Sequence, residues 1–96
     1  MKKIEKFKAK VNAGAAFLSI VNPKWYKNID LKRLNLAKMN VCVLGELYDG
    51  YENGQVCVGI NNSSSEALGF DTENGVDYPL LTKLWKSKIR SLLRRK

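Results

Sequence analysis

The C-terminal part of the chain carries the pattern that most restricts the fold. Apolar residues recur there at spacings of three and four, which places them on one face of an α-helix; they are Tyr78, Leu81, Trp85, Ile89 and Leu92. Asp77 precedes this stretch and Pro79 lies in its first turn, and both are typical of a helix start. The pattern therefore predicts an amphipathic helix over residues 78–94, with Asp77 as its N-cap.

A second long helix is predicted at the N-terminus, over residues 3–21. Its apolar residues have the same spacing: Ile4, Phe7, Val11, Ala15 and Leu18. Asn22-Pro23 ends this helix, because a residue before proline is pushed out of the helical region. Gly14 lies between alanines and would allow another helix to approach closely. A short helix over residues 23–28 is expected to follow.

The middle of the chain gives shorter and more ambiguous patterns. Residues 29–36 favour an extended connection, and apolar residues predict a short helix over about 40–48. Asp49-Gly50 and Asn53-Gly54 are turn dipeptides, and residues 55–60 alternate as a strand would. A small β-hairpin near 47–60 is therefore the structural alternative. A turn over residues 66–69 would be capped by Ser64 or Ser65.

A chain of 96 residues has the size of one domain with one hydrophobic core. The predicted fold class is mainly α: a compact single domain of three to four helices over residues 1–96. Its core is expected to contain the large apolar residues of these helices and of the segments between them, namely Phe7, Leu18, Trp25, Leu44, Leu47, Phe70, Leu81 and Trp85.

Charge is segregated along the chain. Residues 39–82 contain seven acidic residues and no Lys or Arg, whereas the rest is basic and the whole chain carries a net charge of +8. Such polarity points to binding of a partner more than to a reaction. One alternative is self-association, in which the basic ends of one copy bind the acidic middle of another.

The residue types needed for common catalytic sites are missing. The chain has no histidine, which is the commonest general base near neutral pH and the commonest metal ligand. It also lacks a nucleophile elbow, a phosphate-binding glycine loop and a CxxC pair. Glu46, Asp49 and Glu52 lie three residues apart and are interpreted as solvated surface carboxylates, with weak binding of a divalent ion as the alternative. We therefore expect a non-enzymatic protein without catalytic residues, metal or cofactor.

The cysteines and the hydropathy indicate the compartment. Cys42 and Cys57 both lie among apolar residues, and we expect them to be buried, reduced thiols of a cytoplasmic protein. No apolar stretch approaches the roughly 20 residues that span a membrane. The basic start is interrupted by Lys8 and Lys10, where a secretion signal would be apolar. No membrane partner is expected.

Basic residues of the predicted C-terminal helix lie at spacings of three and four, opposite Trp85. This cationic stripe consists of Lys83, Lys86, Arg90 and Arg94, extended by Arg95 and Lys96. It could contact the phosphates of a nucleic acid or an acidic protein partner. It could equally be the solvated face of an amphipathic helix, whose last turn favours basic residues. Tyr26 is a further candidate binding residue, able to stack on a base or anchor an interface, while its neighbour Trp25 is expected in the core.

The order of several short motifs resembles that of small proteins of unknown function encoded by bacteriophages and prophages. The motifs are Gly14-Ala-Ala-Phe-Leu18, Pro23-x-Trp25, Ile29-Asp-Leu-x-x-Leu-x-Leu36, Cys42-Val-Leu-Gly-x-Leu-Tyr48, Gly69-Phe70 and Asp77-Tyr-x-x-Leu-Thr-x-x-Trp85. The most specific motif is Cys42-Val-Leu-Gly. The pattern often has a second cysteine three residues earlier, where this chain has Met39.

The resemblance implies phage biology and no particular activity. It leads to the expectation of a phage-type accessory protein in the bacterial cytoplasm that binds and modulates a host macromolecule. The partner would be a host protein or a protein–nucleic acid complex, as for an anti-CRISPR-like inhibitor of host defence. The alternative is a nucleic-acid-binding protein that uses its basic C-terminal helix.

Overall fold

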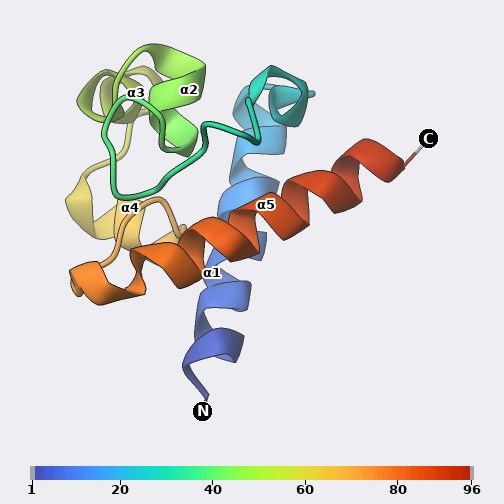
Figure 1. Cartoon of the computed structure of the whole chain (residues 1–96). Helices are drawn as coiled ribbons and strands as arrows, with labels where there is room; N and C mark the ends of the chain where they lie inside the picture. Colours follow the sequence, from blue (N-terminus) through green and yellow to red (C-terminus); the bar gives the residue numbers. More distant parts are fainter. Residues whose placement is uncertain (1, 96) are drawn as a thin grey trace.

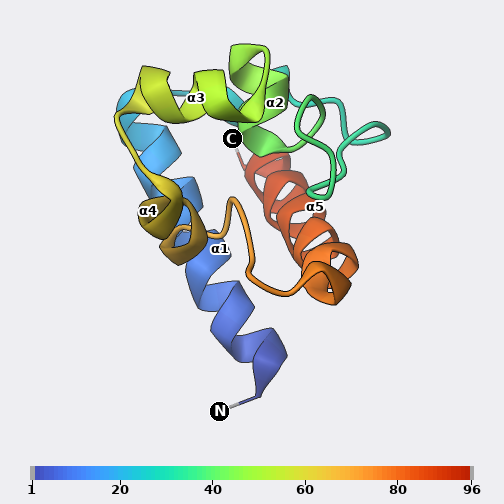
Figure 2. The same ribbon diagram turned by 90° about the vertical axis from the view of Figure 1, so that its left-hand side faces the viewer.

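Two long helices form the frame of the molecule, and three short helices and two 3-10 turns complete it. The computed structural model describes residues 2–95. Their helices are α1 (Lys3–Val21), the 3-10 turn η1 (Trp25–Asn28), α2 (Val43–Tyr48), α3 (Tyr51–Val58), α4 (Asn62–Ala67), the 3-10 turn η2 (Gly75–Asp77) and α5 (Tyr78–Arg94). Figure 1 shows α5 crossing in front of α1. Figure 2 shows α2 and α3 over one end of this pair, with α4 beside α1.

The mainly helical single-domain prediction is confirmed, and the two long helices have the predicted bounds. The predicted three to four helices are five within residues 2–95, because α3 and α4 are also helical. None of the helices in this range combines the length and apolar character needed to cross a membrane.

Gly14 lies where α1 meets both α5 and the end of α4. A Cβ atom on Gly14 would come within 2.0 Å of the Leu68 carbonyl oxygen and 3.0 Å of the Trp85 ring. Glycine is therefore required here by close approach and not by its backbone angles. The expectation that Gly14 permits a close helix contact is confirmed.

The core is centred on three aromatic side chains that are almost fully buried. The rings of Trp25 and Trp85 meet edge to face with centroids 5.8 Å apart, and Phe70 stacks on Trp85 at 5.5 Å. These are favoured arrangements of aromatic pairs. Seven of the eight predicted core residues are buried, and the eighth, Leu47, is half-buried and packs against them.

The β-hairpin alternative near 47–60 is wrong, because Asn53-Gly54 lies inside helix α3 and no strand occurs in residues 2–95. Gly54 is buried against α2, where a Cβ atom would stand 2.8 Å from the Cβ of Leu44. The side-chain amide of Asn53 donates a hydrogen bond to the Tyr48 carbonyl. Close packing of α3 on α2 thus replaces the turn that the dipeptide favours.

Two helix starts differ from their predictions. Helix α2 begins at Val43 instead of about residue 40, because the Cys42 sulfur accepts a hydrogen bond from the Gly45 N–H at 3.3 Å and so caps the helix. Asp77 lies at the start of α5, but its side chain makes no capping hydrogen bond. Its carboxylate instead accepts a hydrogen bond and ion pair from the Lys3 ammonium at 3.0 Å, which joins the two long helices.

The segments around α4 and η1 also differ in detail. Residues 62–67 form α4, which is capped by the Asn61 side chain: its Oδ1 accepts from the Ser64 N–H at 2.9 Å. The predicted serine caps are therefore wrong. The short helix after α1 is the 3-10 turn η1, and Pro23 lies before it.

The two cysteines occupy different environments, and neither forms a disulfide. Cys42 is buried, and this burial raises the pKa of its thiol. Cys57 is exposed, so the prediction that both are buried is wrong for Cys57. The apolar neighbours of Cys57 suggested burial, but Val56 and Cys57 both lie on the exposed face of α3.

Candidate nucleic-acid interface

The segment between η1 and α2, residues 29–42, has no regular secondary structure but is firmly attached to the core. Four of its apolar side chains are buried, namely Ile29, Leu34, Leu36 and Val41. The Leu36 N–H donates to the Thr82 hydroxyl oxygen of α5 at 2.9 Å. The Asn35 N–H donates to the Val41 carbonyl at 2.9 Å, which closes the segment on itself.

Local turns place the basic residues of this segment in solvent. The Asp30 carboxylate accepts a hydrogen bond from the Lys32 N–H at 2.9 Å, and the Asn35 side chain accepts one from the Ala37 N–H at 3.0 Å. Such side-chain-to-backbone bonds stabilise turns. Lys32, Arg33 and Lys38 are all exposed.

A groove of about 650 Å³ lies between this segment and α5. We call it the basic groove, because the residues among 2–95 that line it include four cations, Lys32, Arg33, Lys38 and Lys86, and no acidic residue. The rest of its lining is polar or aliphatic, including Thr82 and Pro79, with no aromatic side chain.

The four cations of the basic groove take part in none of the ion pairs found within residues 2–95. The ion pairs found within residues 2–95 are Lys3 with Asp77 and Lys10 with Glu66, the latter at 3.9 Å. Both lie away from the groove lining. The lining of the groove therefore presents net positive charge to a ligand, with Asp30 as a nearby carboxylate outside the lining.

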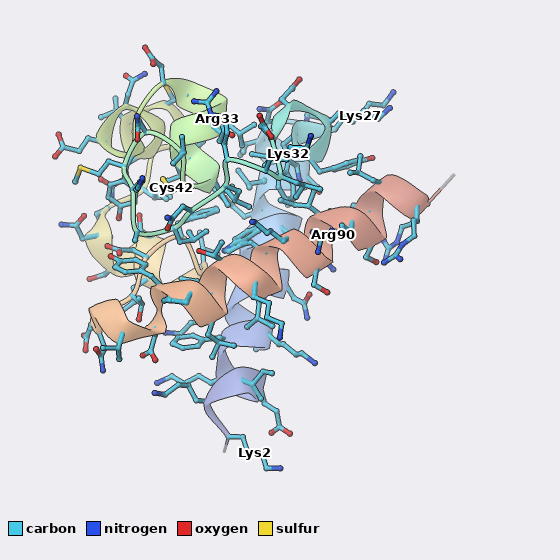
Figure 3. The ribbon with its side chains drawn as sticks, viewed as in Figure 1. Lys2, Lys27, Lys32, Arg33, Cys42 and Arg90 are labelled. Atoms are coloured by element: carbon cyan, nitrogen blue, oxygen red, sulfur yellow. The ribbon has the colours of Figure 1, made fainter. Side chains whose placement is uncertain are left out.

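Of the predicted stripe, only Lys86 is among the described residues that line this groove. Lys83, Arg90 and Arg94 are exposed on α5, and Lys86 is half-buried at the groove. Figure 3 shows Arg90 on the same side of the molecule as Lys32 and Arg33, and Figure 2 agrees in placing the 29–42 segment and α5 on one side.

Two predicted residues lie apart from this arrangement. Arg95 is exposed but follows the last residue of α5, where the backbone is extended. Tyr26 is half-buried and does not line the groove; its ring packs edge to face on Trp25 with centroids 5.8 Å apart. The predicted extension at Lys96 lies outside the described residues.

Sequence reasoning missed Lys32, Arg33 and Lys38 as members of the site. One pattern in the sequence could have indicated these residues. In residues 29–41, buried apolar residues alternate with exposed basic residues. The sequence does not show that this segment folds back beside Lys86, some fifty residues later.

Part of the acidic block lines a second hollow. This hollow, of about 530 Å³, is lined by Glu52, Glu66, Asp71 and Glu73 and, among residues 2–95, by no Lys or Arg. The charge segregation of the sequence is only partly kept in space, because Glu66 and Asp77 of the acidic block form ion pairs with Lys10 and Lys3 of α1. Within residues 2–95, no group of three or more Cys, Asp or Glu side chains is arranged to hold a metal ion.

No protein-family model, curated protein or solved structure matches this chain. The choice of a function therefore rests on the geometry of the chain's own residues.

Proposed function

We propose that this protein is a non-enzymatic, cytoplasmic binding protein that contacts the phosphate backbone of a nucleic acid through its basic groove. The observation that supports this proposal is the convergence of four cations, from two distant segments, on a groove with no carboxylate among the residues 2–95 that line it. Lysine and arginine are the usual partners of nucleic-acid phosphates, and Arg33 adds the planar group that binds a phosphate through two N–H donors.

The stripe on α5 extends the contact beyond the groove. Lys83 and Arg94 are eleven positions apart, and at 1.5 Å per helical residue they span about 16 Å. This length corresponds to about five nucleotides at 3.4 Å each. Because no aromatic side chain lines the groove, base stacking has no platform there, and binding is expected to depend little on base sequence.

The resemblance to phage proteins gives this proposal a biological setting. The bound nucleic acid would belong to a host complex that the protein modulates, such as an RNA-containing defence complex in the bacterial cytoplasm. Binding of phosphates would then compete with that complex's own nucleic acid.

The experiment is a binding titration of labelled random-sequence DNA, single-stranded and duplex, across a salt series. If four to six phosphates are contacted, the logarithm of duplex affinity falls with the logarithm of salt concentration with a slope of about −4 to −5. A variant with Lys32→Ala, Lys38→Ala and Lys86→Ala should flatten this slope by about 3 and weaken binding at least about 10-fold.

A charge-matched control separates the groove from net charge. Lys2→Ala, Lys6→Ala and Lys8→Ala remove the same charge from exposed positions of the N-terminal segment, and should weaken binding less than about 3-fold. Equal losses in the two triple variants, or no binding by the wild type at 50 mM salt, would contradict the proposal.

A further inference from the structure

A small cavity of about 130 Å³ lies beneath the 36–42 segment, next to the acidic hollow. Its lining includes the aromatic residues Tyr51, Phe70 and Tyr78 and one charged residue, Asp71. Tyr51 and Asp71 also line the acidic hollow, so the two spaces adjoin. The cavity also borders the basic groove, because Leu36 and Ala37 line the cavity whereas their neighbours Asn35 and Lys38 line the groove.

The Asp71 carboxylate is held in place by three donors. Oδ1 accepts hydrogen bonds from the Tyr78 hydroxyl and, at 2.8 Å, from the Thr72 backbone N–H. Oδ2 accepts a hydrogen bond from the Tyr51 hydroxyl at 3.3 Å. The hydrogen bond to Asp71, followed by desolvation, raises the pKa of Tyr78 to about 12, so this phenol keeps its proton further into the alkaline range than an ordinary tyrosine.

This arrangement leaves the carboxylate able to accept a further ligand. An ionised carboxylate has about four lone-pair positions, so Oδ2 retains one after the bond from Tyr51. Within residues 2–95, Asp71 takes part in neither of the ion pairs. It is therefore a rigidly placed, half-buried anion without a counter-ion.

We propose that this cavity binds the side-chain ammonium group of a lysine in a basic protein segment, with Asp71 as the counter-ion. The aromatic and aliphatic walls of the cavity suit the alkyl chain of a lysine. Its volume suits the end of one side chain, because pockets for drug-sized molecules start at about 300 Å³. The adjoining carboxylates Glu52, Glu66 and Glu73 would attract further basic residues of the same segment. A phosphate-containing ligand would be repelled here.

The probe is the peptide acetyl-Gly-Lys-Gly-Lys-Gly-Lys-Gly-amide, titrated into the full chain at 150 mM salt. Its matched control carries norleucine in place of each lysine, which keeps the alkyl chain and removes the ammonium. The lysine peptide should bind with shifts in amide NMR signals centred on residues 51, 71 and 72. The norleucine peptide should bind at least about 10-fold more weakly.

Single substitutions test whether Asp71 is the counter-ion of the bound ammonium group. Asp71→Asn should weaken binding of the lysine peptide at least about 10-fold. Asp49→Asn removes the same charge from an exposed position that lines neither hollow, and it should change affinity less than about 3-fold. Lys86→Ala should leave peptide binding unchanged. If Asp71→Asn fails to fold, as thermal unfolding would show, the wild-type shift map and the norleucine control decide the matter.

Three results would overturn the proposal: no shifts at 2 mM lysine peptide, equal binding of the norleucine peptide, or unchanged binding by Asp71→Asn. Analytical sedimentation in the same buffer tests whether a second copy of the chain, instead of a basic segment of another protein, occupies the cavity. A dimer that Asp71→Asn dissociates, without peptide binding, would assign the cavity to a second copy of the chain. These tests do not involve oligonucleotides, so either proposal can fail alone.

Discussion

The indole N–H of Trp85 donates a hydrogen bond to the carbonyl oxygen of Gly69 at 2.6 Å, inside the core. Gly69 has a positive φ of 75°, and a Cβ atom there would stand 3.1 Å from the backbone of α1 at Lys10 and Val11. Trp85 thus connects α5 to the chain that leaves α4, at a point where that chain also lies against α1. One side chain holds three parts of the fold together.

Trp85→Phe should lower the free energy of unfolding by about 2–4 kcal/mol, because it removes ring volume and leaves the buried Gly69 carbonyl unpaired. Trp25→Phe is the matched variant. Trp25 is also fully buried, but its indole donates to Ser19, which is exposed and can bond water instead. Urea unfolding should show a larger loss for Trp85→Phe; the reverse order would contradict the role given to its hydrogen bond.

Gly14→Ala should destabilise the protein by about 2–3 kcal/mol, although alanine favours a helix by about 1 kcal/mol over glycine. The new Cβ would overlap the Leu68 carbonyl, a backbone atom that cannot move alone. Gly75→Ala is the control, since nothing lies within 4 Å of its added Cβ. The free energy of unfolding of Gly75→Ala should lie within about 1 kcal/mol of the wild-type value. A Gly14→Ala variant as stable as the wild type would refute the close contact.

Tyr78 should make stability depend on pH in the alkaline range. Its pKa is about 12 in the folded state against 10 for an ordinary tyrosine, so the folded state holds the proton more tightly. The resulting stabilisation is complete below pH 10 and is lost as pH rises through about 12. Urea unfolding at pH 9, 10 and 11 should show that the free energy of unfolding of the wild type and that of Tyr78→Phe become more similar as pH rises. A difference that stays constant with pH would exclude this linkage.

The two cysteines should differ in reactivity towards iodoacetamide. Cys57 is exposed, whereas Cys42 is buried with a raised thiol pKa, and thiolate is the reactive form. Mass spectrometry at pH 8 should show one rapid modification, at Cys57, and a second at least about 10-fold slower. Cys57→Ser should remove the rapid reaction, and rapid labelling of that variant would show that Cys42 is accessible.

The long helices and the main core residues are predictable from the sequence because their signals are local. A spacing of three and four over residues 3–21 and 78–94, with a proline near an end of each, restricts the backbone to one regular structure. The same spacing marks Leu18, Leu81 and Trp85 as inward-facing, and all three are buried.

The middle of the chain is less predictable because its local signals conflict. Asn53-Gly54 favours a turn, yet contact with Leu44 makes that glycine part of helix α3. The apolar neighbours of Cys57 favour burial, yet the helix turns that residue outward. In both cases, packing between helices outweighs a preference of about 1 kcal/mol or less.

The sequence by itself determined that the chain is mainly helical, that its charge is segregated, and that α5 carries a basic stripe. Only the tertiary structure decided that Lys32, Arg33 and Lys38 stand beside Lys86, and that Tyr51 and Tyr78 converge on Asp71. The physical reason is the separation along the chain of the residues that determine each feature. Helical periodicity depends on neighbours three and four positions away, whereas a groove or cavity depends on how buried side chains from distant segments fill one core.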